Sequence, residues 1–515
     1  MAFVALVIGC LAVFGWKYAA PILERRAQVN TSDAVKVKGT MKIGVDNFLG
    51  YYVLCSPYLR SLMRNTGYEL QCADDDAAYE KRMEQLQKGE IQFAVATIDS
   101  YELNALKAKF PGLLFMVIDR STGADGALGR KNKVSNIDDI KRGGLKVAFA
   151  PGTPSEHLIK VLSRDFDIPQ WRSRDKSWQV LAKSSQDAMK KFEAGQADVV
   201  FGWEPDLTKT LQGNPDTVVK IIGTEVAPRA IIDILMVQRD YGRTHSEVVA
   251  VLLSNYFRSL YYYRTNPDVA LVHAAEFAKI DRKYLADAMK GVTWVNLAEN
   301  ATLWFGIPEP GQQPQFGLIE AIESTMRILV EYGDFKENPL PDKGNPRSIV
   351  WSDPIEQLYR SGLADNEKVD PKSADAFSRD FSELTDEEWD TQRAIGTLSM
   401  LQQITFPSGV DILSANAKEI VDRLAETVKG YPGLRIVVDG HTSTRGDARV
   451  NLELSQDRAE AVARYFMVTY GVKQNRIHAV GYGGSKPLKQ RLDETDREHQ
   501  SRLPRVVVKL VTEAF

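Results

Sequence analysis

Near the C-terminus, a loop rich in hydroxyl side chains and a nearby cation form a combination that suits binding of a carboxylate. The loop contains Thr442 and Ser443 and follows an apolar strand predicted over residues 434–438. Further along, apolar residues repeat at helical spacing, which predicts an amphipathic helix. We expect Ser455 to be the N-cap of this helix, which would place Arg458 in its first turn. An arginine held there can bind a carboxylate through two parallel hydrogen bonds. An ordinary strand–loop–helix with a surface arginine is the alternative interpretation.

Polar and aromatic side chains also follow several predicted strands in the first half of the chain. In an open α/β sheet, ligands bind at the carboxyl ends of the strands. Trp203 would then offer an aromatic wall, and Glu204 an acceptor for an amine. The candidate ligand-binding residues at these strand ends are Asn47, Tyr51, Thr97, Asp99, Thr153, Ser155, Trp203 and Glu204. Packing at the rim of the sheet is the alternative for each of them.

One of these stretches has the pattern of a helix start. Thr153 is the expected N-cap, Pro154 the first helical residue and Glu156 the acceptor of a reciprocal capping box. The free amides of such a helix can bind an anion if a cleft faces them. Simple helix capping without a ligand explains the same residues.

Composition and motifs exclude several classes of function. Hydrophobic residues make up 44% of the 515 residues and charged residues 26%, values that are ordinary for a folded protein. The formal net charge of −3 leaves no basic footprint for nucleic acid. The six histidines are scattered without metal-binding spacing, and no nucleophile elbow occurs. We therefore expect no enzyme, no catalytic residues, no metal and no cofactor.

Short β-branched runs alternate with helical stretches from residue 41 to residue 238, which favours an α/β fold with largely parallel sheets. Helices follow, predicted over 246–265, 267–277, 282–290 and 316–332. An earlier helix is expected over 52–66. The predicted strands are 41–45, 68–72, 91–96, 113–118, 145–150, 180–182, 197–201, 218–222 and 233–238.

Two of the three cysteines lie close together in this scheme. Cys55 is expected early in the first helix and Cys72 near the end of the second strand. In an oxidising compartment they could form a disulfide, and two buried free thiols are the other possibility.

Residues 2–23 form the one candidate for a membrane span, interrupted only by Lys17. At about 1.5 Å per residue the run can cross a hydrocarbon core of about 30 Å. A cleaved signal peptide fits poorly, because Tyr18 stands where a small residue is needed. A lipoprotein site ending at Cys10 fits loosely. An uncleaved single-pass anchor is the favoured interpretation, although Lys17, Arg25 and Arg26 all lie at or beyond its end.

The C-terminal stretch resembles the OmpA-like peptidoglycan-binding domain over about residues 395–515. The matching positions are Gly440-His441-Thr442, Gly446, Asn451, Leu454-Ser455, Arg458-Ala459, Gly471-Val472, Arg476-Ile477, Gly481, Gly483 and Pro487. The resemblance implies a wall-peptide site at Thr442, Ser443, Asn451, Arg458 and Arg505. Ser443 replaces the aspartate that in this family holds the ammonium of diaminopimelate, and Leu503-Pro504 replaces its Asn-Arg. The resemblance therefore implies binding that is weaker or altered in specificity.

The region from about residue 40 to 360 resembles the type II periplasmic solute-binding proteins of the taurine, sulfonate, nitrate and thiamine-precursor branch. The matching stretches are Gly44 to Tyr51, Asp125-Gly126, Ile137 to Lys141, Lys146 to Ala148, Ala194 to Asp198 and Trp203-Glu204-Pro205. In that family two lobes close on a ligand, and the resemblance adds Asp125 to the ligand-binding candidates.

These patterns predict an α/β protein with a two-lobed, periplasmic-binding-protein-like domain and a smaller α+β OmpA-like domain, preceded by one transmembrane helix. The expected segments are an anchor at 1–26, a solute-binding-like domain at 40–360, a linker at 361–394 and a wall-binding domain at 395–515. We expect an inner-membrane anchor with the bulk of the chain in the periplasm, where it binds a small molecule and peptidoglycan. A membrane protein complex is a further candidate partner. A scaffold with a degenerate or protein-docking cleft is the alternative function, and an enzyme on a similar two-lobed fold is the third.

Overall fold

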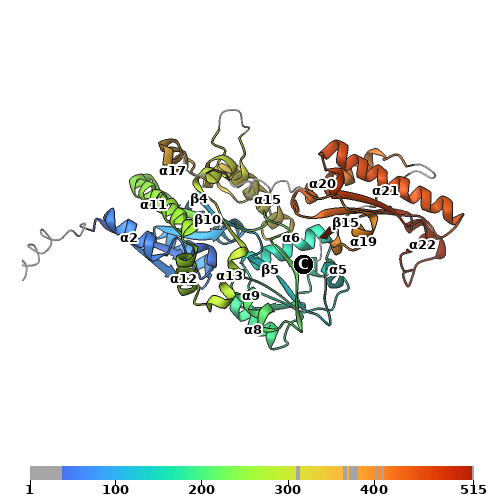
Figure 1. Cartoon of the computed structure of the whole chain (residues 1–515), viewed down its shortest axis with the longest axis horizontal. Helices are drawn as coiled ribbons and strands as arrows, with labels where there is room; N and C mark the ends of the chain where they lie inside the picture. The colour runs from blue at the N-terminus through green and yellow to red at the C-terminus, as the bar shows by residue number, and fades with distance from the viewer. Residues whose placement is uncertain are drawn as a thin grey trace, which may run out of the picture.

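The computed structural model describes residues 37–308, 314–363, 368–369, 381–400, 403–404, 406 and 411–512. Figure 1 shows two lobes built on separate sheets and a smaller C-terminal domain beside one of them. The expected anchor at 1–26 and much of the expected linker at 361–394 lie outside the described residues. Within the described ranges, no helix has both the length and the apolar character needed to cross a membrane.

The first lobe, lobe I, contains a six-stranded sheet in the order β11-β4-β10-β3-β1-β2. Strands β10 and β11 run antiparallel to their neighbours, whereas β1 pairs in parallel with β2 and β3. Every residue of β3 and β4 is buried, as expected for central strands covered on both faces. The strands are β1 (Gly39–Val45), β2 (Tyr68–Asp74), β3 (Phe93–Thr97), β4 (Gly112–Ser121), β10 (Ile232–Gln238) and β11 (Val292–Trp294).

The second lobe, lobe II, contains a five-stranded sheet in the order β7-β6-β8-β5-β9. Strand β5, which the sequence patterns did not predict, runs antiparallel to both of its neighbours. Its sequence, DGALGR, contains two glycines and lacks the β-branched residues that mark a strand. The strands are β5 (Asp125–Arg130), β6 (Val147–Phe149), β7 (Gln179–Leu181), β8 (Val199–Trp203) and β9 (Val218–Gly223).

Two chain crossings connect the lobes, one from β4 to β5 and the other from β9 to β10. The hydroxyls of Ser121 and Thr224 meet at 2.6 Å and so join the two crossings. The Thr224 hydroxyl also accepts a hydrogen bond from the Gly123 amide at 2.9 Å. Paired crossings of this kind let two lobes move about a short hinge.

Helices cover the sheets of both lobes. The helix expected over 52–66 begins only at Pro57, because Ser56 caps it by accepting from the Leu59 amide. Cys55 therefore lies in the turn before this helix and not inside it. The helices of lobe I are α2 (Pro57–Asn65), α3 (Tyr79–Gln87), α4 (Ile98–Asn104), α10 (Arg239–Thr244), α11 (Ser246–Thr265), α12 (Pro267–Ala278), α13 (Arg282–Lys290), α14 (Leu297–Glu299), α15 (Gly317–Glu331), α16 (Pro341–Gly344) and α17 (Asp353–Leu358). The helices of lobe II are α5 (Ile137–Ile140), α6 (Pro154–Phe166), α7 (Pro169–Arg172), α8 (Ser185–Glu193) and α9 (Asp206–Gly213).

The C-terminal domain packs helices on a four-stranded sheet in the order β12-β15-β13-β14. Thr385 and Glu388 form a reciprocal capping box at the start of its first helix. The elements are α19 (Asp386–Asp390), β12 (Arg393–Thr397), α20 (Ala415–Lys429), β13 (Arg435–His441), α21 (Ala448–Tyr470), β14 (Ile477–Gly481), α22 (Asp496–Arg502) and β15 (Arg505–Thr512).

The C-terminal domain shares one apolar core with lobe II, and Figure 1 shows α20 and β15 beside α6. Phe166, at the end of α6, packs edge-on against Tyr431 with ring centroids 5.7 Å apart. Backbone groups also join the two parts, since the Ser399 amide donates to the Asp165 carbonyl at 2.7 Å. A Cβ at Gly396 would come within 2.7 Å of the Phe166 ring, so β12 lies directly against α6. The sequence patterns did not predict this contact.

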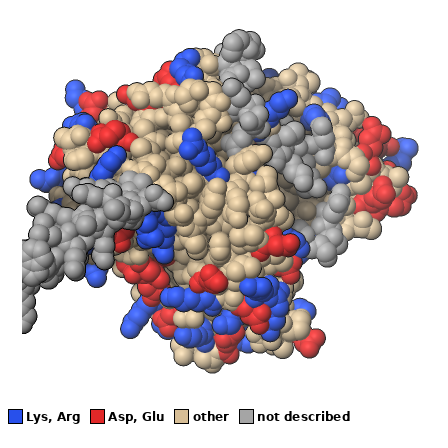
Figure 2. Space-filling model, turned by 60° about the vertical axis from the view of Figure 1, so that its left-hand side comes forward, with Lys and Arg blue, Asp and Glu red and all other residues tan. Residues whose placement is uncertain are grey.

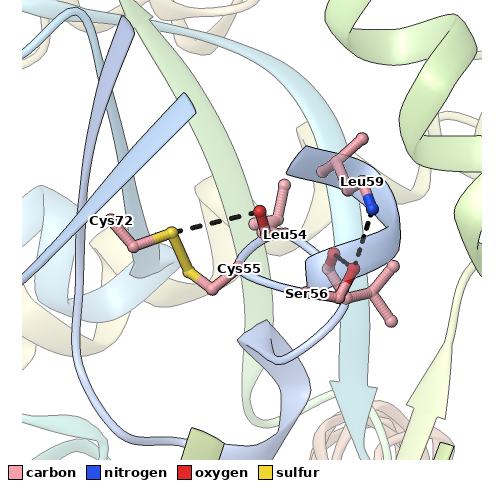
Figure 3. Close-up of a disulfide and its surroundings, with 6 residues drawn as sticks. Leu54, Cys55, Ser56, Leu59 and Cys72 are labelled. Atoms are coloured by element: carbon pink, nitrogen blue, oxygen red, sulfur yellow. Dashed lines mark hydrogen bonds between the residues drawn. A yellow bond between two sulfur atoms is a disulfide. The ribbon is translucent and has the colours of Figure 1, made fainter. Parts of the chain in front are cut away.

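A disulfide joins Cys55 and Cys72 in lobe I, which decides between the two alternatives left open by the sequence. Figure 3 shows the bond linking the turn before α2 to strand β2. The carbonyl oxygen of Leu54 lies 3.9 Å from the sulfur of Cys72.

Charges of both signs are mixed on the face shown in Figure 2. Lys and Arg alternate with Asp and Glu at the left, lower and right parts of the view, and no continuous basic stripe crosses it. This face lacks the electrostatic footprint of a nucleic-acid-binding protein.

Candidate functional site

A small cavity lies between the two lobes, with a volume of about 10 Å³. Four of the residues predicted to bind a ligand line it: Tyr51 and Thr97 from lobe I, and Asp125 and Trp203 from lobe II. We call this space the inner cavity. Its remaining lining residues are Asp46, Phe48, Tyr79, Pro154 and Asp233.

Hydrogen bonds from lobe I hold the inner cavity's polar groups in place. The Tyr51 hydroxyl donates to Oδ1 of Asp233. Thr97 ends β3 and caps α4, because its hydroxyl accepts from the Ser100 amide at 3.3 Å. Asp46 pairs with the buried guanidinium of Arg82 at 3.1 Å.

The carboxyl groups around the inner cavity are shielded from solvent, which favours their protonated forms. Burial raises the pKa of Asp125 to about 7, although a hydrogen bond with Ser121 acts to lower it. Burial also raises the pKa of Asp233 and of Asp119 well above the ordinary range. Asp119 faces Asp233 across the pairing of β4 with β10 and is a further cause of the raised pKa of Asp233, whereas the hydrogen bond between the two carboxyls acts to lower the pKa of Asp119.

The other predicted ligand-binding residues do not line the inner cavity. Asn47 lines a separate, larger space of about 530 Å³ between the lobes, which we call the outer vestibule. Asp99 is buried and accepts from the Ser100 hydroxyl at 3.2 Å, and burial raises its pKa to about 7. Glu204 is also buried and accepts from the Thr208 hydroxyl at 2.8 Å, with its pKa raised to about 7 by burial.

The capping box predicted at the start of α6 does not form. Thr153 is the N-cap, but its hydroxyl donates to the Ala150 carbonyl at 2.7 Å. Glu156 instead accepts from the Gly152 amide at 2.7 Å. Ser155 is buried, and within the described ranges its hydroxyl oxygen has no hydrogen-bond partner. Only Pro154 from this helix start reaches the inner cavity, so the geometry does not provide the expected anion site.

Asp233 is the residue that sequence reasoning missed. It is the second residue of β10, an antiparallel strand, and pairs with Thr97 at the end of β3. The start of an antiparallel strand lies at the same sheet edge as the ends of its neighbours. A carboxyl inside an otherwise apolar run was the available signal.

Direct contacts hold the lobes together around the cavity. The Asn104 amide of α4 donates to the Gly152 carbonyl of lobe II at 3.0 Å. The Gln212 amide of α9 donates to Asp287 of α13 at 2.8 Å. Lys160 of α6 pairs with Asp334, which follows α15, at 2.8 Å. The cleft is therefore closed in this structure.

In the C-terminal domain, α21 begins two turns earlier than the sequence predicted. Its N-cap is Asp447, whose carboxylate accepts from two first-turn amides, and Ser455 lies inside the helix. The prediction failed because an aspartate outside the apolar repeat caps the helix equally well. Arg458 therefore projects from the third turn and not from the first. Its guanidinium lies over the ring of Phe406 at 5.2 Å, and its side chain is largely buried.

The predicted wall-binding loop is held by glycine-rich backbone. The Thr442 amide donates to the Gly483 carbonyl at 2.9 Å, while Ser455 accepts from the Gly483 amide at 2.8 Å. Ser443 lies beside Gly484, where an added Cβ would meet its carbonyl oxygen at 2.6 Å. These contacts bring the loop close to the face of α21 that carries Arg458.

The two remaining predicted wall residues hold the ends of this region. Asn451 donates to the Arg445 carbonyl at 2.9 Å, which fixes the loop to α21. Arg505 begins β15 opposite His441 and donates to the Leu503 carbonyl at 2.9 Å. The pKa of His441 is lowered to about 3 by burial and then by Arg505 and other nearby cations.

Residues 405–501 match the OmpA family, and the C-terminal domain is thus OmpA-like. A relative, the peptidoglycan-associated lipoprotein of Brucella melitensis, is 32% identical over 92 residues, which are 18% of this chain and 54% of that protein. The chain spans about half the length of the curated relatives it matches.

The N-terminal region is similar in structure to periplasmic solute-binding proteins. The alkanesulfonate-binding protein SsuA from Xanthomonas axonopodis pv. citri covers 62% of this chain with all of its own length, at 14% identity and a TM-score of 0.46. The nitrate-binding protein NrtA from Synechocystis PCC 6803 covers 66% of this chain, with 92% of its own length, at 12% identity and a TM-score of 0.45. The desulfurization enzyme DSZB covers 63% of the chain, with 99% of its own length, at 11% identity and a TM-score of 0.42.

Proposed function

We propose that this chain is a cell-envelope protein that binds a small solute between its two lobes and attaches to peptidoglycan through its C-terminal domain. We assign this chain no catalytic step and no cofactor. We also propose that the bulk of the chain lies in the periplasm and that the apolar stretch 2–23 is a single-pass anchor in the inner membrane.

The inner cavity carries the solute-binding half of the proposal. Tyr51 and Thr97 reach it from lobe I, and Asp125 and Trp203 reach it from lobe II. A ligand held there would contact both lobes and so stabilise their closure. The hinge at Ser121 and Thr224 would let the lobes separate for entry.

The wall-binding half rests on the OmpA match and on the charge around the loop after β13. Arg458 and Arg505 lie near this loop, and the Lys486 ammonium lies 3.5 Å from the centroid of the Tyr482 ring. Such a surface suits a peptide carboxylate, and a hydrogen bond between charged partners contributes roughly 1.5–3 kcal/mol.

Co-sedimentation of the full-length chain, in detergent, with purified peptidoglycan tests the attachment. Arg458→Ala should reduce the apparent affinity for peptidoglycan by about tenfold or more, which corresponds to at least about 1.4 kcal/mol. Arg449→Ala is the matched control, because Arg449 is exposed in the first turn of the same helix. Equal pelleting of both variants and wild type would show that Arg458 does not bind the wall.

A scaffold with a closed cleft is the second candidate. It is favoured by the inner cavity's volume of about 10 Å³, which is about the space that one water requires. The contacts Asn104–Gly152 and Gln212–Asp287 also hold the lobes shut without a ligand. If the double variant Asn104→Ala/Gln212→Ala opens the cleft in X-ray scattering but no solute recloses it, the scaffold function is supported.

A further inference from the structure

The inner cavity is acidic and aromatic, whereas a site for a sulfonate or nitrate would need cationic or amide donors. Its lining includes Asp46, Asp125 and Asp233, and among the residues described no Lys, Arg or His joins them. Arg82, which pairs with the lining residue Asp46 at 3.1 Å, also donates to the Val95 carbonyl at 2.7 Å.

Asp233 provides a separate indication that a donor group belongs in this cavity. Its side chain is 1% exposed, and Oδ1 already accepts from the Tyr51 hydroxyl. Within the part of the chain that the structure describes, no N–H or hydroxyl group donates to its Oδ2, and the Asp119 carboxyl is its hydrogen-bonding neighbour. A buried carboxyl oxygen is nearly always hydrogen-bonded and can accept more than one bond, so Oδ2 of Asp233 has room for a donor from the cavity.

The size and walls of the inner cavity define that donor. A volume of about 10 Å³ admits one water-sized group, such as an ammonium. Phe48, Tyr79 and Trp203 add aromatic surface, which attracts a cation through the ring faces. A metal ion fits less well, because the described residues contain no group of three or more His, Cys, Asp or Glu placed to hold one.

The outer vestibule, of about 530 Å³, has the same charge character. The consecutive residues Asp46 and Asn47 line one space each. Asp76 of lobe I and Asp206 of lobe II approach closely enough for Asp76 to raise the pKa of Asp206, although burial is the larger cause. The vestibule's charged lining residues are Asp74, Asp75, Asp76, Asp206, Asp281, Lys209 and Lys279.

We propose that the solute is a small linear aliphatic amine, whose ammonium group occupies the inner cavity against Asp233 while its chain extends into the outer vestibule. This inference rests on the proposed solute-binding function and specifies its ligand. The ammonium donates an N–H group to Oδ2 of Asp233. In the empty cleft burial favours the protonated form of Asp233, so binding leaves its carboxylate paired with the ammonium and releases the proton to the solvent.

Isothermal titration calorimetry of the full-length chain, in detergent, tests the inference. The probes are 1,4-diaminobutane, its neutral analogue 1,4-butanediol, and the anions methanesulfonate and nitrate. We expect the diamine to bind at least 100-fold more tightly than the diol, and to release a proton when buffers of different ionisation enthalpy are compared. Asp233→Asn should weaken diamine binding at least tenfold, while Asp175→Asn, at an exposed position in lobe II, should not.

The double variant Asp76→Asn/Asp206→Asn provides a second test at the cavity mouth, where the fold depends less on the side chains. It should weaken diamine binding severalfold. If an anion binds and the diamine does not, the amine inference is overturned and the solute-binding function stands. If no probe binds, both are overturned. Diamine binding that neither Asp233→Asn nor the double variant weakens would overturn the proposed site.

Discussion

The hydroxyl of Tyr431 donates to Oδ2 of Asp165 at 2.8 Å and thereby joins the OmpA-like domain to lobe II. Asp165 lies in the last turn of α6, whose first residue, Pro154, lines the inner cavity. A helix of this length spans about 20 Å at 1.5 Å per residue. One rigid helix therefore connects the cleft with the OmpA-like domain.

Tyr431→Phe should loosen this connection, because it leaves Asp165 buried with one donor fewer. Loss of such a bond costs about 1–3 kcal/mol. We expect calorimetry to show an earlier, separate unfolding transition for the C-terminal domain. Tyr470→Phe is the matched control, since its hydroxyl donates to Asp422 at 2.6 Å within the same domain. A single unshifted transition for Tyr431→Phe would mean that this bond does not couple the domains.

The buried carboxyls predict that the empty protein is more stable in mild acid. Burial raises the pKa of Asp99, Asp125 and Glu204 to about 7, above their values near 4 in an unfolded chain. A carboxyl with a raised folded pKa contributes stability that is fully present below about pH 4 and is lost as pH rises through about 7. The free energy contributed by these groups should therefore fall between pH 5 and pH 8.

Asp125→Asn isolates one of these contributions. Relative to wild type, the variant should gain roughly 2–3 kcal/mol between pH 5 and pH 8, since each pKa unit corresponds to about 1.4 kcal/mol. Denaturant unfolding at both pH values measures this gain. Burial lowers the pKa of His157 and His441 to about 3, so these two groups make the protein less stable in acid and act against the effect of the carboxyls. Wild type and variant both retain them, so they do not affect the difference between the two. The carboxyls that act on Asp125 are Asp46, Asp99, Asp119, Glu204 and Asp233. A difference that does not change with pH would contradict the assignment.

The disulfide should contribute measurably to the stability of lobe I. It closes a loop across a sequence separation of 17, for which the chain-entropy model gives about 3 kcal/mol. Cys55→Ser/Cys72→Ser should lower the free energy of unfolding by about that amount. Reductant should destabilise wild type similarly and leave the double variant unchanged. An equal effect of reductant on both chains would assign the loss to another cause.

Much of the fold was predictable, because strands such as β3 and β4 are continuous apolar runs whose burial decides their conformation. The missed strand β5 lacks that signal, since neighbouring strands impose its extended conformation. The start of α21 was missed because a helix beginning with the polar residues around Asp447 has no apolar repeat there. The contact between Tyr431 and Asp165 joins residues far apart in sequence, and no local pattern encodes it.

The residues that line the inner cavity could likewise be predicted only in part. Tyr51, Thr97 and Trp203 could be named from their positions after predicted strands. Asp233 could not, because its place depends on β10 lying antiparallel between β3 and β4. Sheet order is a property of the whole chain and is not visible in a single strand.

Gly440 illustrates a position where backbone contact requires glycine. A Cβ there would lie 2.0 Å from the Ser455 carbonyl oxygen, so β13 and α21 approach without room for a side chain. Gly440→Ala should lower the stability of the C-terminal domain by about 1–3 kcal/mol, the usual cost of overpacking. Gly213→Ala is the control, because open space surrounds that position at the end of α9. Thermal unfolding should show a loss for the first variant only.

Ser443 offers a direct test of how the wall ligand is held. It is half-buried, and its hydroxyl donates to the Arg445 carbonyl at 3.2 Å. A neutral hydroxyl holds an ammonium weakly, whereas a carboxylate at this position would form a charge-assisted hydrogen bond of roughly 1.5–3 kcal/mol. Ser443→Asp should therefore increase co-sedimentation of the full-length chain with peptidoglycan by about tenfold or more in apparent affinity. Thr444→Asp, one residue along the exposed loop, adds the same charge and should have little effect. If both substitutions strengthen binding equally, net charge and not a specific ammonium contact is responsible, and if neither does, the loop does not hold the ammonium half of the ligand.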